Sequence, residues 1–361
     1  MPLPLRPLAA LLALACGVAH AEVNHAPALA ELASGELLAC WYSGSAEAAS
    51  DGRILCARSP DGGATWSVPQ PAVAPGERAA GGREAAKSLG NVVLHAESAR
   101  VWMVHAEIQR WDVPPFGTLC RTWLCGRVDV RLSYDGGRSW SAAARLDDQV
   151  GALPRGGLLR HPTLGWLLPL YREGQATAFI RRVTFAGEAV EIGAPLDLPG
   201  HGMIQPSLVL QGDGTLRAFL RDTTAVAVRT ATLDPATLRW SAAAATDLPN
   251  PNAAVEAFAA EDGRIVLVHN PSRRDRRALA LAASDDGVRF TPGCALVLEG
   301  SQGEVAYPAA IRARDGTWHI AYSSDGKRRI RHRRFDQVWL RACLGGQSNG
   351  SVLESTILTD R

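Results

Sequence analysis

One strand pattern recurs six times along the chain. In each copy a small residue, five times Gly and once Ala, precedes an apolar stretch that ends in a polar or aromatic side chain. The copies occupy residues 35–42, 99–107, 165–172, 214–222, 263–270 and 316–322. Strand-like units repeated about every 50 residues are typical of a β-propeller, in which each unit is one four-stranded blade. The sequence therefore predicts an all-β fold, a six-bladed β-propeller.

A second, shorter repeat is in phase with the first. Residues 59–66 and 133–140 both read S-x-D-G-G-x-[ST]-W, residues 284–290 are a shortened copy and residues 232–240 a degenerate one. Residues 185–187 mark the expected place of a decayed copy. In such a turn the Asp accepts hydrogen bonds from the backbone, the glycines permit positive φ, and the aromatic residue packs between blades. We expect each copy to join the third and fourth strands of its blade.

This motif is the Asp box, and the chain resembles the sialidase (neuraminidase) superfamily of BNR-repeat propellers. The resemblance covers nearly all of residues 22–335. It implies that the Asp-box hairpins lie on the outer rim, away from the axis. They therefore predict the fold and carry no information on catalysis.

Residues 1–21 have the composition of a secretory signal peptide. They contain one Arg, an apolar stretch over residues 8–18 and an Ala-His-Ala sequence that is typical of a cleavage site. We therefore expect a mature chain from Glu22, a propeller over residues 22–340, a C-terminal extension over residues 341–361, and a secreted or periplasmic location. Residues 13–16 form an imperfect lipoprotein box, so lipid anchoring at Cys16 is an alternative.

Composition argues against several partners and leaves the cysteine chemistry open. The net charge of +2 gives no reason to expect nucleic acid, and no apolar run after the N-terminus is long enough to cross a bilayer. No cysteine spacing matches a zinc site, and no metal cofactor is implied. Export permits disulfides, and Cys120 and Cys125 would close a short loop. Cys40 and Cys56 fall on neighbouring predicted strands, where a disulfide and two buried thiols explain the sequence equally well.

Polar residues gather at one end of the predicted blades. The first strand of each blade lines the channel and the second runs antiparallel to it, so first-strand starts and second-strand ends meet on one face, where loops converge. The starts supply His25, Lys87, Asn91, Arg155, Gln205, Asn252, Glu256 and Tyr307, and the ends supply Tyr42, His105, Glu107, Tyr171, Arg172, Arg221, Asp222, His269, Asn270 and Tyr322. Any one of them is more often an ordinary rim residue, but the two converging rings predict a polar sugar-binding site.

The resemblance assigns chemistry to some of these positions. Sialidases hold the substrate carboxylate with three arginines, attack the anomeric carbon with a Tyr polarised by a Glu, and use an Asp as acid/base. Guanidinium groups suit the first task because they bind carboxylates bidentately, and a Tyr needs an activating neighbour for the second. By resemblance Arg221 is the second arginine, Arg276 the third in preference to Arg274 or Arg277, and Tyr307 the nucleophile.

Three positions depart from that pattern. His25 stands where the family has its first arginine, and Gln205 where it has the Glu that polarises Tyr. Residues 87–91 contain no Asp, and the nearest carboxylate is Glu84, with Glu256 and Glu304 as other possible bases. We therefore expect catalytic roles for Tyr307, Glu256 and His25. The residues expected to bind substrate are Arg221, Arg276, Gln205, Tyr42, Lys87, Asn91, His105, Arg155 and Asn252.

Three functions fit this set of residues. The first is an exported glycoside hydrolase of the exo-α-sialidase type that acts on an acidic sugar. The second is a uronate-directed polysaccharide lyase, because His and Tyr can move protons once the uronate charge is neutralised. The third is a carbohydrate-binding propeller without catalytic activity, because fold does not fix function. In each case the expected partner is a glycan or an acidic sugar.

Overall fold

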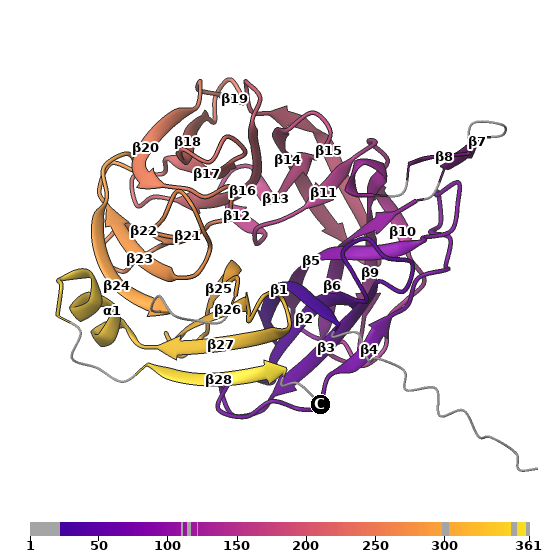
Figure 1. Ribbon diagram of the computed structural model, residues 1–361, viewed down its shortest axis with the longest axis horizontal. Helices are drawn as coiled ribbons and strands as arrows, with labels where there is room; N and C mark the ends of the chain where they lie inside the picture. The colour runs from indigo at the N-terminus through magenta and orange to yellow at the C-terminus, as the bar shows by residue number, and fades with distance from the viewer. Residues whose placement is uncertain are drawn as a thin grey trace, which may run out of the picture.

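The computed structural model describes residues 22–109, 111–113, 117–120, 122–297, 303–347 and 352–358. The expected signal peptide, residues 1–21, lies outside them. The described residues form six antiparallel sheets around a central axis (Figure 1). This confirms the predicted six-bladed propeller.

The first three blades follow one another in the sequence. Blade one contains β1 (Val23–Glu31), β2 (Leu37–Gly44), β3 (Arg53–Ser59) and β4 (Gln70–Val73). Blade two contains β5 (Ser88–Glu97), β6 (Arg100–Ile108), β9 (Gly126–Ser133) and β10 (Ala144–Asp147). Between β6 and β9 lie the hairpin β7 (Trp111–Val113) and β8 (Gly117–Cys120) and the short 3-10 helix η1 (Trp123–Cys125). Blade three contains β11 (Ala152–Pro154), β12 (Leu159–His161), β13 (Gly165–Arg172), β14 (Thr177–Ala186) and β15 (Ala189–Asp197).

The last three blades complete the ring. Blade four contains β16 (Met203–Leu210), β17 (Leu216–Asp222), β18 (Ala227–Asp234), β19 (Arg239–Trp240) and β20 (Ala244–Pro249). Blade five contains β21 (Glu256–Ala259), β22 (Ile265–His269), β23 (Leu279–Ser284) and β24 (Thr291–Val297). Blade six contains β25 (Ala306–Arg312), β26 (Trp318–Ser324), β27 (Arg329–Phe335) and β28 (Leu353–Leu358). The six repeated strand patterns are β2, β6, β13, β17, β22 and β26, which are the second strands of the six blades.

The Asp boxes occupy the predicted third-to-fourth strand hairpins. In blade one, Asp61 accepts a hydrogen bond from the backbone N–H of Thr65 (2.9 Å), and Ser59 Oγ accepts one from Gly63 (2.7 Å). The indole of Trp66 then packs against His332 of blade six, with ring centroids 5.3 Å apart. The box therefore fixes its own turn and also joins neighbouring blades, as expected.

Blade one packs directly against blade six, and each blade is built from one continuous segment. Trp66 Nε1 donates to Ser355 Oγ (3.1 Å), and that hydroxyl donates to the carbonyl of Gly63 (2.6 Å). Ser355 lies on β28, the outermost strand of blade six. Part of the segment expected to form a C-terminal extension therefore completes the propeller, because β27 offers an edge with which β28 can pair.

Disulfides join strands within blade one and fasten a helix to blade five. Cys40 and Cys56 are paired directly opposite each other on β2 and β3 and form a disulfide, so the alternative of two buried thiols is wrong. Cys294 of β24 is bonded to Cys343 of α1 (Gln337–Leu344), which ties this helix to blade five on the outside of the ring (Figure 1). Cys125 is also disulfide-bonded. None of the helices in the described part of the chain is long and apolar enough to cross a bilayer.

Candidate functional site around Tyr307

Three inner strands begin with the same backbone irregularity. In β1, β16 and β25 the pairing with the second strand shifts register at a bulge. Each bulge holds a residue with positive φ immediately before a proline: Ala26 (53°), Gln205 (55°) and Tyr307 (57°). Left-handed backbone is uncommon in residues other than glycine and has a conformational cost. A bulge changes the direction of the side chains it holds. The bulges in β16 and β25 therefore explain how the side chains of Gln205 and Tyr307 meet across the axis.

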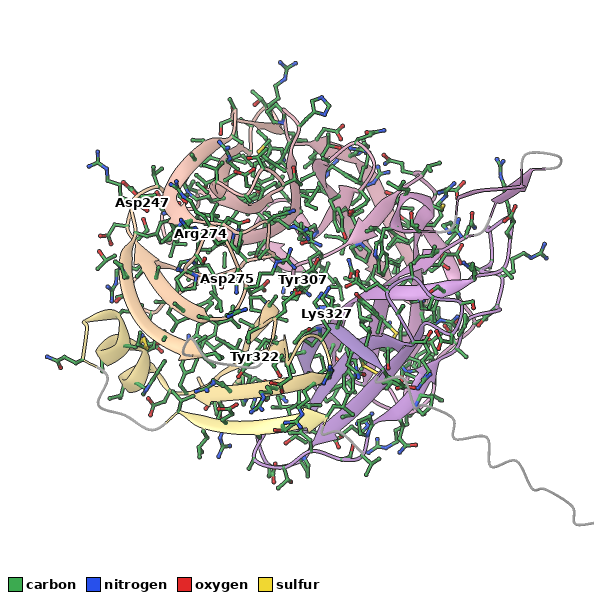
Figure 2. All side chains as sticks on the ribbon, in the orientation of Figure 1. Asp247, Arg274, Asp275, Tyr307, Tyr322 and Lys327 are labelled. Carbon is green, nitrogen blue, oxygen red and sulfur yellow. A yellow bond between two sulfur atoms is a disulfide. The ribbon has the colours of Figure 1, made fainter. Side chains whose placement is uncertain are left out.

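Tyr307 lies near the centre of the ring of blades (Figure 2). Its hydroxyl oxygen accepts hydrogen bonds from two side chains of blade four, Arg221 Nη1 at 2.8 Å and Gln205 Nε2 at 3.1 Å. The same Arg221 nitrogen donates to Gln205 Oε1 at 3.1 Å, so the three side chains form a closed triangle. Both donors reach the phenol oxygen, which leaves its own proton to point toward a ligand.

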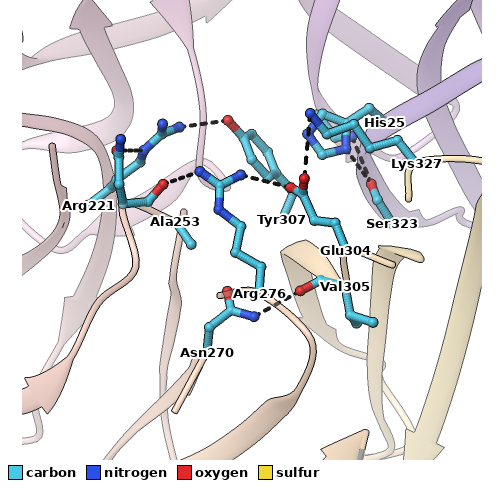
Figure 3. Close-up of polar contacts among 12 residues, drawn as sticks. His25, Arg221, Ala253, Asn270, Arg276, Glu304, Val305, Tyr307, Ser323 and Lys327 are labelled. Atoms are coloured by element: carbon cyan, nitrogen blue, oxygen red, sulfur yellow. Dashed lines mark hydrogen bonds and ion pairs between the residues drawn. The ribbon is translucent and has the colours of Figure 1, made fainter. Parts of the chain in front are cut away.

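Asn252 holds two arginines side by side. Its side-chain oxygen accepts a hydrogen bond of 2.6 Å from Arg221 Nε, and its backbone carbonyl accepts one from Arg276 Nη2. The residue itself has a φ of 56° just before β21. Figure 3 shows the two guanidinium groups on the same side of Tyr307. The cluster thus offers two planar cations to an anionic group.

The loop that carries Arg276 is fastened to the segment preceding β25. Asn270 Nδ2 donates to the carbonyls of Ala278 (2.7 Å) and Val305 (2.8 Å), and Val305 donates to the carbonyl of Arg276 (2.6 Å). Figure 3 shows the contact between Asn270 and Val305. Arg274 and Arg277, the less favoured sequence alternatives, are exposed. The structure therefore brings Arg276 to the site, as the sequence predicted.

A chain of alternating charges runs along one side of the cluster. Arg276 Nη1 pairs with Glu304 Oε1 at 2.7 Å, and Lys327 Nζ lies 3.6 Å from Glu304 Oε2 and 2.6 Å from Glu47 Oε1. Burial opposes the charge of Lys327, but the two carboxylates outweigh it and raise the lysine pKa. The chain connects blades five, six and one and places a third cation beside the site.

His25 packs against the ring of Tyr307. The two ring centroids are 4.1 Å apart, and His25 Nδ1 shares a hydrogen bond of 2.8 Å with Ser323 Oγ. Burial, helped by the nearby cations Lys327 and Arg155, lowers the pKa of His25 well below its usual value. The imidazole is therefore neutral at pH 7, and His25 does not replace the charge of the arginine expected at its position.

Two residues expected at the site are buried inside the ring. Arg155 is 3% exposed and donates to the backbone carbonyls of Pro308 (2.6 Å) and Pro27 (3.3 Å). Its guanidinium is therefore shielded from solvent and is not placed to bind a substrate, as the sequence had predicted it would. Glu256 is 5% exposed, and its burial raises its pKa to about 7 even though Arg155 and a hydrogen bond with Ser207 favour its charged form.

Aromatic side chains lie beside the triangle of Arg221, Gln205 and Tyr307. Tyr171 OH accepts hydrogen bonds from Asn91 Nδ2 (3.0 Å) and Gln205 Nε2 (3.3 Å). Tyr42 meets the indole of Trp123 in an edge contact, with centroids 5.5 Å apart. Trp123 can lie there because Gly90 has no Cβ, which would be 2.2 Å from the indole. Asn91 and Tyr42 are thus in the cluster, as expected.

Other predicted members lie elsewhere. His105 is buried in blade two, where its Nε2 accepts a hydrogen bond of 3.3 Å from Arg131, and Glu107 on the same strand face pairs with Arg145. Tyr322 accepts a hydrogen bond from Arg333 inside blade six. Lys87 precedes β5, and among the described residues its side chain makes no hydrogen bond with the cluster. The structure does not bring these four side chains to Tyr307.

Sequence reasoning missed Glu47, Glu173, Lys327 and Trp123. The first three lie in loops between the second and third strands of blades one, three and six. These hairpin loops emerge on the same face as the second-strand ends, so extending the search a few residues beyond each strand would have found them. Burial raises the pKa of Glu173, while the charge of Arg221 opposes that shift. Trp123 belongs to the insertion in blade two, for which the repeat gives no position.

The geometry defines what the cluster can do chemically. Arg221 and Arg276 provide charge-assisted donors for a carboxylate, and Tyr307 places a hydroxyl directly beside them. The described residues contain no group of three or more His, Cys, Asp or Glu side chains arranged to hold a metal ion. A carboxylate held by the arginines would lie next to the phenol oxygen of Tyr307.

Comparison with known proteins bears on the fold. A family model described as a BNR repeat-like domain matches residues 35–320. Among curated proteins, none matches the chain.

Solved sialidase structures share the architecture at low identity. The NanB sialidase from Streptococcus pneumoniae has 13% identity and a TM-score of 0.65, and the match covers 84% of this chain and 66% of that one. A leech intramolecular trans-sialidase has 13% identity and a TM-score of 0.66 over 89% and 69% of the two chains. The intramolecular trans-sialidase from Ruminococcus gnavus has 12% identity and a TM-score of 0.66 over 87% and 94%. At this identity the likeness shows a shared fold.

Proposed function

The chain belongs to the family of BNR repeat-like domains, and from this membership and the cluster around Tyr307 we propose that it is an exported, sialidase-like glycoside hydrolase that acts on an acidic sugar. The observation that carries this proposal is the contact of 2.8 Å between Arg221 Nη1 and the hydroxyl of Tyr307. The expected signal peptide at residues 1–21 supports export.

Carboxylate binding begins with Arg221. Its Nε and Nη1 are held by Asn252, Gln205 and Tyr307, and among the described residues Nη2 has no protein acceptor. Burial opposes the charge of Arg221, but the neighbouring phenols of Tyr307 and Tyr171 outweigh it and raise the arginine pKa. The side chain is therefore a fixed cation with one donor to offer, and Arg276 lies beside it.

The short distance between cation and nucleophile restricts the substrate. A carboxylate bound by Arg221 would lie close to the Tyr307 oxygen, which favours a substrate whose reacting carbon itself carries the carboxylate. A 2-keto-acid sugar such as sialic acid meets this requirement, because its carboxylate is attached to the anomeric carbon. The relatives named above as sialidases and trans-sialidases fit the same reading.

The proposed reaction is a double displacement. The Tyr307 oxygen attacks the anomeric carbon, the glycosidic bond breaks, and water later releases the sugar from Tyr307. Gln205 orients the phenol but cannot accept its proton. We assign the proton transfers to Glu173, which directly follows β13 and whose pKa burial raises above the usual carboxyl value. As a carboxylate it would take the phenol proton and pass a proton to the departing oxygen, and in the second step it would pass a proton from the attacking water to the Tyr307 oxygen. Glu256 is too deeply buried for that role.

A fluorogenic sialoside, assayed beside a panel of uronate-containing glycans, tests the proposal. Release of sialic acid by the wild type, with loss of at least about 100-fold in Tyr307→Phe, is the expected result. The matched control is Tyr134→Phe, because Tyr134 is exposed on the Asp-box hairpin of blade two. Activity that survives Tyr307→Phe would overturn the assignment of the nucleophile.

One observation favours a second function, the uronate lyase. Among the described residues only N–H donors contact the Tyr307 oxygen, and the amide of Gln205 stands where sialidases, by the resemblance, place a carboxylate. Such an oxygen suits a base that removes the proton from the carbon next to a neutralised carboxylate. No activity on sialosides, together with new ultraviolet absorbance from a uronate glycan, would support this reaction. Saturable binding with no product would instead indicate a carbohydrate-binding propeller.

A further inference from the structure

One side chain of blade three crosses the ring to blades one and six. Arg155 follows β11, yet its Nη2 donates to the carbonyl of Pro308 at 2.6 Å and its Nη1 to the carbonyl of Pro27 at 3.3 Å. Its guanidinium carbon also lies 5.1 Å from the centroid of the Tyr307 ring. The nearest parts of three blades therefore meet at one guanidinium group.

The two carbonyls belong to strained backbone. Pro27 follows Ala26 and Pro308 follows Tyr307, and both preceding residues have positive φ, 53° and 57°. Such conformations persist only where the surroundings enforce them. Because Arg155 binds the carbonyl next to each bulge, it holds the backbone that sets the direction of Tyr307.

The charge of Arg155 is balanced inside the protein. The side chain is 3% exposed, and its Nε has no acceptor in the part of the chain that the structure describes. Burial therefore lowers the pKa of Arg155, while Glu256 opposes that shift most strongly. An isolated buried charge would be costly. In its ionised form Glu256, 5% exposed on β21 of blade five, offsets part of this cost, and the carbonyls of Pro27 and Pro308 accept hydrogen bonds from the guanidinium. A buried cation whose hydrogen bonds go to backbone carbonyls indicates a structural task.

We propose that Arg155 is a positioning residue that fixes the left-handed turn and the ring orientation of Tyr307 through the Pro308 carbonyl and the contact with the ring. Its effect on turnover rests on the proposed function, whereas its effect on Tyr307 does not. Because Arg155 is buried and contacts the Tyr307 ring and the adjoining carbonyls, it would act on the reaction through that ring and backbone.

Fluorine NMR of protein labelled with 3-fluorotyrosine tests the positioning directly. The chain has five tyrosines, and the Tyr307 resonance is assigned by its disappearance in Tyr307→Phe. In Arg155→Met we expect this resonance to shift or broaden while that of the exposed Tyr134 stays unchanged. Arg155→Lys should restore it in part, because a lysine keeps the charge but can reach only one carbonyl well. If Arg155→Met does not fold, Arg155→Lys becomes the test variant.

Arg160→Met is the matched control. Arg160 is an exposed arginine of the same blade, and its guanidinium carbon lies 5.9 Å from the centroid of the Trp166 ring. Its substitution therefore removes a similar contact between an arginine and an aromatic ring outside the cluster around Tyr307. An unchanged Tyr307 resonance in a folded Arg155 variant would overturn the proposal.

Kinetics separates positioning from substrate binding. If a substrate is turned over, Arg155→Met should lower kcat by about 100-fold with little change in KM, because a displacement of the nucleophile impairs the chemical step. A rise in KM alone would contradict the proposal. If no glycan is turned over, the proposed function fails while the NMR result still decides the role of Arg155.

Discussion

The hydroxyl of Tyr307 and the guanidinium of Arg221 are 2.8 Å apart although they come from different blades. Tyr307 opens the inner strand of blade six, and Arg221 lies near the end of the second strand of blade four. Gln205 completes the contact by donating to the same phenol oxygen. A guanidinium cation and a phenol hydroxyl are thereby fixed together, which reduces the reorganisation that the proposed carboxylate binding and reaction would require.

Gln205→Glu should raise hydrolytic activity if the chain is a sialidase-type hydrolase. The new carboxylate would accept the hydroxyl proton of Tyr307 and pair with Arg221, which already binds Gln205 Oε1 at 3.1 Å. We expect kcat on a sialoside to increase by about 10-fold or more, since general-base assistance contributes at least that much. Gln211→Glu, at a half-buried position directly after β16, is the control. A variant that folds but loses activity would argue that the amide itself serves the reaction.

Arg221→Lys should weaken binding of a carboxylated sugar by about 10- to 100-fold. A lysine keeps the charge but cannot contact Asn252, Gln205 and Tyr307 at once while offering a further donor to the ligand. Isothermal titration with the free acidic sugar measures the loss. Arg229→Lys, in which the altered residue pairs with Asp222 of the same blade at 3.1 Å, should bind normally. Equal affinity of the Arg221 variant and the wild type would remove Arg221 from the binding site.

The sequence predicted those parts of the site that follow from blade topology. Gln205, Asn252 and Tyr307 start inner strands and Arg221 ends a second strand, so a rule of alternating strand directions was enough to bring them together. The same rule failed for His105 because neighbouring residues on a strand face opposite sides. Its side chain faces Arg131 on β9 and not the axis. The approach of Lys327 to Glu47 depends on the paths of two hairpin loops, which no periodic pattern specifies.

Glu256→Gln should change how stability depends on pH. Burial raises the pKa of Glu256 to about 7 in the folded protein, from 4.5 as the reference for the unfolded chain. A raised carboxyl pKa means that the favourable contribution is fully present below pH 4.5 and is lost as pH rises through about 7. The wild-type free energy of unfolding should therefore fall by about 3 kcal/mol relative to the variant over this range.

Denaturant unfolding at several pH values between 4.5 and 8 measures this difference. His25 and the other buried histidines titrate in both proteins, so their contributions cancel in the comparison. The exposed Glu84→Gln serves as the control for the loss of one carboxyl group. A pH-independent difference for Glu256→Gln would show that this carboxyl is not desolvated in solution.

Gly63→Ala should destabilise the propeller more than Gly187→Ala does. Both glycines have positive φ, 83° and 63°, so alanine incurs a backbone cost of about 1 kcal/mol at either site. A Cβ on Gly63 would also lie 2.1 Å from Cε1 of His332, whereas nothing lies within 4 Å at Gly187. We expect an additional loss of about 1–3 kcal/mol for Gly63→Ala. Similar unfolding midpoints for the two variants would mean that blade one does not pack on His332 as described.

Removal of the disulfide between Cys294 and Cys343 should destabilise the oxidised protein more than removal of the one between Cys40 and Cys56. The first bond encloses a loop with a sequence separation of 49 and the second one of 16. In the chain-entropy model the two bonds contribute about 4 and about 3 kcal/mol, because the longer loop restricts the unfolded chain more. Denaturant unfolding of the double serine variants, with and without reductant, measures both losses.

The Cys294 and Cys343 bond also anchors α1, which precedes β28 in the chain. Its loss should therefore raise hydrogen exchange in β28 first, and uniform exchange across all blades would contradict that local role.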